Sequence, residues 1–328
     1  MLNFFVFAPN RTMLPIVPAI CFACVLLIPS LNWALNLVAD VELLSGYDDN
    51  INRKEDKKKT ESAFVSVIPS VSFNGQMTDG INASFGYAFT YTQYLSDGLE
   101  NEMLHRAWGD ITARLRPRLF LNLVGRIEVL ENQESPDDDG WGFTLSPGLT
   151  YHITDTLSAR VIAIYSRWRY DNLNFDSGRA IIHLEEPQVD NRYAAEGGIT
   201  YLLFLSTYLD LAYRFTYNES SNSIDEYNVH NVLIGLNSAI VNNVKMTLGY
   251  NYGRWNYFNW RAGKMLRGKL RDDNQHNIWF GLEYSAASFL DLILSAEMTI
   301  NDSNLSYESF DRDLVYGGVR LHWERWGL

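Results

Sequence analysis

The chain has 328 residues, of which 47% are hydrophobic, 14% aromatic and only 20% charged, and its net charge is −12. This composition excludes a disordered chain, a collagen and a disulfide-rich scaffold, and the acidic balance argues against a nucleic-acid-binding protein, which is usually basic. After residue 30 no apolar run approaches the roughly 20 residues that a membrane-spanning helix needs, so the rest of the chain can cross a membrane only as strands.

The first 34 residues have the order of a secretory signal peptide. Arg11 is the only charged residue before Asp40, residues 13–29 form a strongly apolar stretch, and Ala34 is a candidate cleavage position. The alternatives are a retained helical anchor, which the three prolines of the stretch disfavour, and a lipoprotein signal, which lacks its usual aliphatic residue. We therefore expect residues 1–34 to be a signal peptide and residues 35–328 to form one mature domain, which contains no cysteine.

Alternation of apolar and polar residues dominates the chain after residue 37. In residues 81–92, for example, the odd positions are Ile, Ala, Phe or Tyr, and the even positions are Asn, Ser, Gly, Ala or Thr. A period of two places one set on each face of a strand. The sequence predicts fourteen strands, near residues 37–47, 62–75, 80–95, 103–116, 118–131, 141–153, 156–170, 192–204, 207–219, 227–240, 243–257, 274–286, 289–301 and 313–326.

The connections between these runs alternate between very short turns and longer, charged loops, of which residues 171–191 are the longest. Strands of roughly ten or more residues, with short turns at one end and long loops at the other, are typical of outer-membrane barrels. Lipid offers no hydrogen bonds, so a spanning sheet must close on itself. The sequence predicts an all-β fold: an antiparallel up-and-down transmembrane barrel of about 14 strands in the bacterial outer membrane, with both termini periplasmic.

A soluble β-sandwich or β-helix is the alternative, but it does not explain asymmetric loops, a signal peptide and two groups of aromatic residues together. Aromatic residues near the short turns, such as Tyr151 and Trp323, and near the long loops, such as Trp108, Trp255 and Tyr257, are expected to form belts at the two membrane interfaces.

Alternation also assigns an inward face, whose charged residues carry both signs in similar numbers. Either these charges line a hydrated, weakly selective channel, or they form a closed network of ion pairs that plugs the lumen. Four of these residues are expected to form a basic stripe opposite the carboxylates of residues 283, 291 and 297: Arg114, Arg126, Arg160 and Arg214. The candidate lumen-lining residues are Arg114, Arg126, Glu128, Arg160, Glu196, Asp210, Arg214, Glu283, Asp291, Glu297 and Arg320.

Enzyme chemistry has little support in this sequence. No nucleophile and base stand at a spacing typical of a membrane-barrel hydrolase, and no glycine-rich phosphate loop or histidine cluster with metal-binding spacing occurs. We therefore expect a protein that is not an enzyme, with no catalytic residue, no metal site and no cofactor.

The end of the first expected strand reads Gly46-Tyr47-Asp48-Asp49-Asn50-Ile51-Asn52-Arg53, and the second has an apolar-x-Pro centre at Val67-Ile68-Pro69. Together these resemble the beta-barrel porin type 2 family. The resemblance implies an outer-membrane barrel linked with exopolysaccharide or capsule production. Secretion-linked barrels of other families carry a similar run.

The expected function is a passive conduit, with an exported polysaccharide as its cargo, and Asp48, Asp49 and Asn50 are the candidate residues of its mouth. A structural or adhesive barrel with a plugged lumen and a secretion-linked barrel are the alternatives. The expected partners are outer-membrane lipid and lipopolysaccharide, the barrel assembly machinery and periplasmic polysaccharide-export proteins, with no nucleic acid among them.

Overall fold

The computed structural model describes residues 34–51, 53, 59–96, 99, 101–132, 139–170, 174–176, 181–183, 187–204, 206–261 and 269–325. The expected signal peptide lies outside this part of the chain, except for Ala34, the first residue of the first strand. Among the described residues, no helix is both long and apolar enough to cross a membrane.

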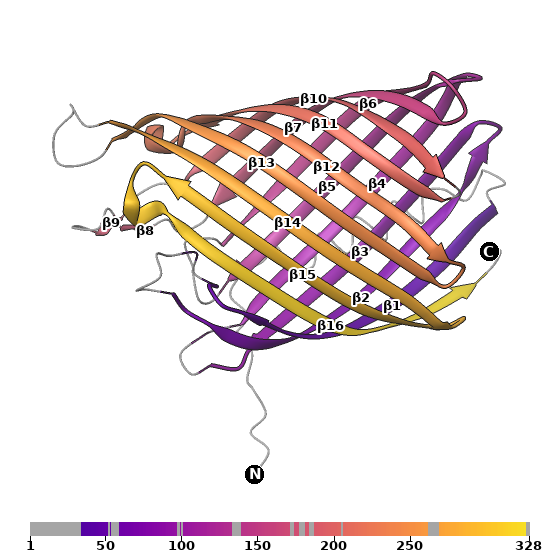
Figure 1. Ribbon diagram of the computed structural model, residues 1–328, viewed down its shortest axis with the longest axis horizontal. Coiled ribbons are helices and arrows are strands. Elements are labelled where there is room, and N and C mark those ends of the chain that lie inside the picture. Colours follow the sequence, from indigo (N-terminus) through magenta and orange to yellow (C-terminus); the bar gives the residue numbers. More distant parts are fainter. Residues whose placement is uncertain are drawn as a thin grey trace, which may run out of the picture.

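The described residues form a closed barrel of fourteen antiparallel strands, which confirms the predicted architecture and strand number (Figure 1). Each strand pairs with its neighbours in the chain, β7 pairs with β10 across the longest connection, and β1 pairs with β16 to close the barrel. A separate two-stranded hairpin, β8–β9, lies within that longest connection and was not predicted.

The barrel strands are β1 (Ala34–Asp48), β2 (Ser62–Thr78), β3 (Ile81–Tyr94), β4 (Glu102–Arg116), β5 (Leu119–Asn132), β6 (Gly140–His152), β7 (Leu157–Tyr170), β10 (Val189–Phe204), β11 (Thr207–Ser220), β12 (Tyr227–Val241), β13 (Val244–Arg261), β14 (Leu270–Ala287), β15 (Leu290–Ser303) and β16 (Phe310–Arg325). The hairpin consists of β8 (Asn174–Asp176) and β9 (Ile181–His183). Two short 3-10 helices are η3 (Ser223–Asp225) and η4 (Ser306–Glu308).

The two ends of the barrel differ as the sequence predicts. Connections of two to four residues join the strands at one end, whereas every connection at the other end is longer. Leu37 at the start of β1 pairs with Arg325 at the end of β16, so both ends of the barrel chain lie at the short-turn end. The side of the membrane to which this end belongs stays a prediction.

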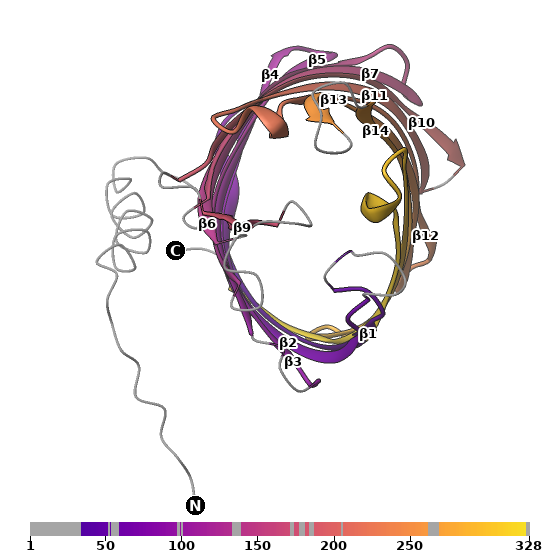
Figure 2. The same ribbon diagram turned by 90° about the vertical axis from the view of Figure 1, so that its left-hand side faces the viewer.

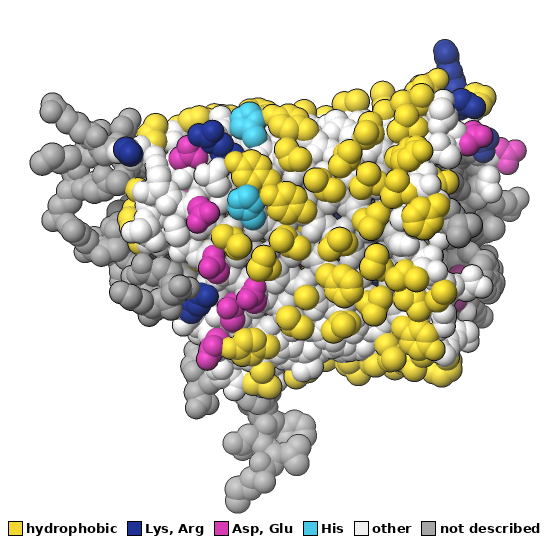
Figure 3. Space-filling view, viewed as in Figure 1, with side chains coloured by type: hydrophobic (Ala, Val, Ile, Leu, Met, Phe, Trp, Pro, Cys, Tyr) yellow, Lys and Arg dark blue, Asp and Glu magenta, His cyan; other side chains and the backbone are white. Residues whose placement is uncertain are grey.

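The outer surface of the barrel is apolar. Val161, Leu211, Leu248 and Leu294, all in the middle of strands, are 65%, 37%, 44% and 46% exposed. Figure 3 shows hydrophobic side chains spread across the outer face of β12 to β16. A water-soluble protein buries such residues, whereas a closed barrel that exposes them around most of its wall presents a surface suited to lipid.

Three outward-facing tyrosine–histidine pairs of the same geometry lie towards the long-loop end of the barrel. In each pair the tyrosine hydroxyl lies within hydrogen-bonding distance of a histidine Nδ1 on the next strand, and a second aromatic ring packs on that histidine. Aromatic side chains with polar tips are typical of membrane interfaces. The pairs are Tyr87–His105 at 2.6 Å, Tyr213–His230 at 2.6 Å and Tyr250–His276 at 2.8 Å.

Part of the expected aromatic belt faces the lumen instead, so that prediction was wrong for Trp108, Trp255 and Tyr257. All three stand at strand positions whose side chains face inward. In the strand register, Trp255 lies opposite the buried Asp273 and Trp108 lies opposite Arg126. Neighbouring positions of a strand point to opposite faces, so residues close together in the chain cannot all join one belt.

Two inward-facing glycines each lie against an inward-facing tryptophan ring of the next strand. A Cβ atom at Gly86 would lie 2.2 Å from Trp108, and one at Gly249 would lie 1.9 Å from Trp279. Only glycine permits such an approach, so each indole lies against the backbone of the neighbouring strand.

Candidate functional site

The inner wall of the barrel is the candidate functional site. The pairing register places the eleven candidate lumen-lining residues in the phase opposite to the exposed hydrophobic set, with Glu196 directly opposite Arg214 and Asp291 directly opposite Arg320. A barrel of fourteen strands is intermediate between small barrels with filled interiors and large aqueous pores. Which groups these residues contact therefore decides what the lumen can do.

The first charged cluster joins β7, β10 and β11. Glu196, only 5% exposed, accepts hydrogen bonds from Arg160 Nε at 3.1 Å and from Arg214 at 2.6 and 3.0 Å. Arg160 also donates to Asp210 Oδ1 at 2.6 Å, and the Thr200 hydroxyl donates to the same oxygen. Two arginines and two carboxylates thus neutralise one another along the wall.

A second cluster centres on Arg320 of β16. Its Nε donates to Glu42 at 2.7 Å and its Nη1 to Glu283 at 2.8 Å, and Glu283 also accepts from Lys245 Nζ at 2.7 Å. Asp291 lies 3.7 Å from the same guanidinium. Glu42 is not among the candidate residues, although its place in the inward phase of β1 could have identified it.

The arginines of β4 and β5 are in a different situation. Arg106 pairs with Glu128 at 2.8 Å, but in the described part of the chain neither Arg114 nor Arg126 forms an ion pair, and both side chains are exposed. The expected basic stripe is therefore interrupted, because Arg160 and Arg214 are neutralised locally. Glu297 accepts a hydrogen bond from Asn277 at 2.9 Å and forms no ion pair with a described arginine.

These ion pairs run along the wall. Within the described residues, the ion pairs of these clusters connect adjacent strands or strands separated by one other, and none of them crosses the lumen. The side chains of Arg214 and Lys245 remain 38% and 67% exposed, so solvent reaches the inner wall. A plugged lumen would bury these groups.

The candidate mouth residues lie at the seam where the barrel closes. Asp48, 1% exposed, forms a bidentate ion pair with Arg312 of β16. The Asn50 amide donates to the Asp311 carbonyl at 2.6 Å, and Asp49 accepts a hydrogen bond from the backbone of Asp313. These contacts tie the long-loop end of β1 to β16.

Two short loops fold inward at the long-loop end, and Figure 2 shows η3 and η4 inside the ring of strands. Both loops have the same design, in which an inward asparagine donates to a backbone carbonyl seven residues later. Asn218 Nδ2 lies 2.7 Å from the Asp225 carbonyl, and Asn301 Nδ2 lies 2.8 Å from the Glu308 carbonyl. Burial is the main reason why the pKa of Asp225 rises to about 6, and the nearby Asp190 carboxylate raises it further.

A charged and aromatic group packs beside these loops. Arg271 of β14 donates to Asp273 at 2.6 Å, pairs with Glu308 at 2.7 Å and lies 4.5 Å from the centre of the Tyr257 ring. Burial raises the pKa of Glu308, although the Arg271 charge opposes the shift. The inner wall of β13 and β14 is thus more closely packed here than near Lys245.

The described residues contain no group of three or more His, Asp or Glu side chains arranged to hold a metal ion.

Comparison with known proteins supports the fold. No family model matches the chain, and no curated protein resembles it in sequence, so the likeness of residues 46–53 to the beta-barrel porin type 2 family stays a prediction.

Among solved structures, the deltaS2 mutant of the TodX monoaromatic hydrocarbon channel aligns with 88% of this chain and 90% of its own, at 10% identity and a TM-score of 0.50. The Pseudomonas putida toluene transporter TodX aligns with a TM-score of 0.48 at 10% identity, covering 88% of this chain and 89% of its own. An anion-selective porin from Comamonas acidovorans aligns with a TM-score of 0.48 at 9% identity, covering 89% and 100%. Together with the closed topology and the apolar outer face, the likeness at a TM-score of 0.50 makes this chain an outer-membrane β-barrel.

Proposed function

We propose that this protein is a passive conduit for hydrophilic solutes across the outer membrane. One observation carries the proposal. The inward ion pairs link nearby strands along the wall, and Arg126 and Lys245 stay exposed to solvent. Hydrated charges along a wall set ion preference, whereas a lumen plugged by ion pairs needs pairs that span it. Solved structures of the same fold are named as channels, which agrees with this reading.

The proposed cargo is an exported polysaccharide. This finer part of the proposal rests on the resemblance of residues 46–53 and on an inner wall that combines polar groups with indole rings such as Trp108. Aromatic rings offer apolar faces and polar edges, as sugars do, so both kinds of surface suit a carbohydrate. The proposal includes no catalytic step.

Single-channel recording in a planar bilayer tests the conduit. The wild-type barrel is expected to carry a steady ion current. Arg126→Glu is expected to raise the preference for cations, seen as a shift of the reversal potential, because it inverts a charge that forms no ion pair with the described residues of the inner wall. Arg254→Gln is the control, since Arg254 faces outward and pairs with Asp272 at 2.8 Å.

A barrel that is folded but silent in every recording would overturn the conduit and favour the structural or adhesive alternative. Equal shifts in the Arg126 and Arg254 variants would mean that the inward and outward faces are assigned incorrectly.

A further inference from the structure

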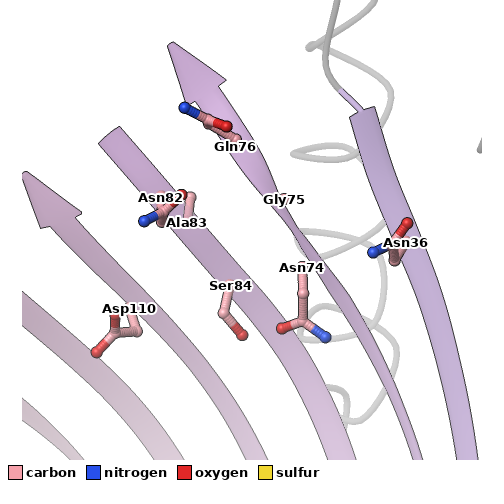
Figure 4. Close-up of a pocket in the computed structure, with 8 residues that line it drawn as sticks. All are labelled: Asn36, Asn74, Gly75, Gln76, Asn82, Ala83, Ser84 and Asp110. Carbon is pink, nitrogen blue, oxygen red and sulfur yellow. The ribbon is translucent and has the colours of Figure 1, made fainter. Parts of the chain in front are cut away.

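A hollow of about 370 Å³ lies on the inner wall of β1 to β4, near the short-turn end of the barrel (Figure 4). Asn36, Asn74, Ser84 and Asp110 form one row across the four strands, because each pairs directly with the next. Gln76 and Asn82 pair in the row nearer the turn, and Gly75 and Ala83 complete the lining. The volume falls towards the lower end of the roughly 300–1,000 Å³ typical of ligand pockets.

The lining of this hollow combines four amides, a hydroxyl and a carboxylate, with no lysine or arginine. An amide side chain both donates and accepts hydrogen bonds, as a sugar hydroxyl does. Asp110 adds an acceptor and repels anions. One carboxylate is too few for a calcium site, which takes six to eight oxygen ligands.

These polar groups are largely uncommitted. Asn74 has one long hydrogen bond to Ser72, at 3.3 Å, and Asp110 accepts one from Thr112 at 3.4 Å. Gln76 and Asn82 are exposed side chains. Glu196 and Glu283, on other parts of the inner wall, are by contrast held by cationic side chains. Groups that already converge on one space and keep their hydrogen-bonding capacity are ready to receive a ligand.

The Trp108 indole lies beside the hollow. Its ring packs against Gly86 of β3, two positions from Ser84 on the same face, and Trp108 itself stands two positions from Asp110 on β4. The absence of a side chain at Gly86 lets the indole lie against the wall, next to the row that holds Ser84 and Asp110. A flat apolar face next to hydrogen-bonding groups matches the two surfaces of a pyranose ring.

We propose that this hollow is a binding subsite for a neutral sugar unit, with Trp108 as the stacking surface and the amides of residues 36, 74, 76 and 82 as hydrogen-bonding partners of its hydroxyls. The proposal rests on the proposed function, because it gives the conduit a contact point for polymer at the short-turn end. It also specifies the cargo, which is hydroxyl-rich and uncharged at the unit that binds here.

Two measurements test the subsite with neutral hexasaccharides of glucose, galactose and mannose as probes. Calorimetry in detergent measures binding whether or not the barrel conducts, and the block of ion current in a planar bilayer measures binding in the lumen. At least one probe is expected to bind the wild-type protein. Asn82→Ala is expected to weaken that binding about threefold to tenfold, because it removes the hydrogen bonds of one amide, and Trp108→Leu is expected to weaken it more.

Asn237→Ala is the matched control, since Asn237 is also an exposed, inward asparagine near the short turns but lies on β12, on another part of the wall. It is expected to change binding less than twofold. Equal weakening by the two asparagine variants, or no binding of any probe to a conducting barrel, would overturn the subsite and leave the conduit standing. Sugar binding that depends on Asn82 in a barrel without current would overturn the conduit and leave the subsite standing.

Discussion

Glu196 and Arg126 represent the two situations of charged residues on the inner wall. Glu196 is 5% exposed and holds both Arg160 and Arg214, whereas Arg126 is exposed and forms no ion pair with any described residue. A carboxylate that holds two guanidinium groups contributes to the fold, because its loss leaves both cations with fewer partners. A hydrated, unpaired arginine contributes mainly to the electric field in the lumen.

The first prediction compares these two residues. Glu196→Gln keeps the shape of the side chain but removes its charge, and it is expected to lower the free energy of unfolding by about 1–3 kcal/mol. Arg126→Gln is expected to change that free energy by no more than about 0.5 kcal/mol. Urea unfolding of the barrel refolded in lipid vesicles measures both. An equal, large loss in the two variants would indicate that the inner wall is packed and dry.

Glycines that receive an aromatic ring permit the second prediction. A Cβ at Gly249 would lie 1.9 Å from Trp279, so Gly249→Ala must displace the indole and is expected to cost about 1–3 kcal/mol of stability. Gly197→Ala is the control, because no atom lies within 4 Å of a Cβ there. The thermal unfolding midpoints of the two variants measure the difference, and a similar midpoint for both would show that Trp279 moves freely away from the wall.

At the scale of secondary-structure elements, η3 is held by backbone and side-chain contacts that include a protonatable group. The Asp225 carboxyl accepts a hydrogen bond from Asn222 at 3.1 Å, and its charge interacts unfavourably with Asp190 and favourably with Arg271. Its pKa of about 6 lies above the ordinary value of 3.8, mainly because the group is buried. The folded loop therefore binds a proton more tightly than the unfolded loop does.

The third prediction follows from the sign of this shift. A raised pKa contributes stability that is fully present below about pH 4 and is lost as the pH rises through about 6. The loop at residues 221–226 is expected to open more readily at pH 7 than at pH 5, by about 1 kcal/mol. Hydrogen exchange of its amides, corrected for intrinsic rates, measures this. Asp225→Asn is expected to abolish the pH dependence and the exposed Asp302→Asn to retain it; retention by both variants would contradict the assignment.

The strands themselves could be predicted from the sequence, whereas their contacts could not. A lipid-facing strand must alternate, so its period and length are visible in the residues between 81 and 92 and in thirteen further runs. The partner of Arg160, by contrast, depends on β7 pairing with β10 across a connection that holds β8 and β9. The hollow at Asn74 and Asn82 was missed because scattered amides carry no periodic signal, and their convergence arises from the register of four strands.

At the scale of the whole molecule, closure of the barrel depends on contacts between the two ends of the chain. Asp48 and Arg312, 264 residues apart, form a bidentate pair at the long-loop end of the β1–β16 seam. A seam is the place where a barrel can open, and a buried ion pair there fixes the register of the two strands. Residues 46–50 could be recognised from the sequence as a distinctive run, but their role in closure needs β16 beside them.

The last prediction concerns how the barrel sits in the membrane. The short-turn end carries both ends of the barrel chain, and in outer-membrane barrels the short turns are periplasmic and the long loops extracellular. An epitope tag inserted at Lys269, beside the longer connection between β13 and β14, is expected to bind antibody on intact cells. A tag inserted at Asp155, in the exposed turn between β6 and β7, is expected to bind antibody only after the outer membrane has been permeabilised. Reversed labelling would place the sugar subsite of β1 to β4 at the cell surface, where it would meet sugars outside the cell rather than polymer leaving the periplasm.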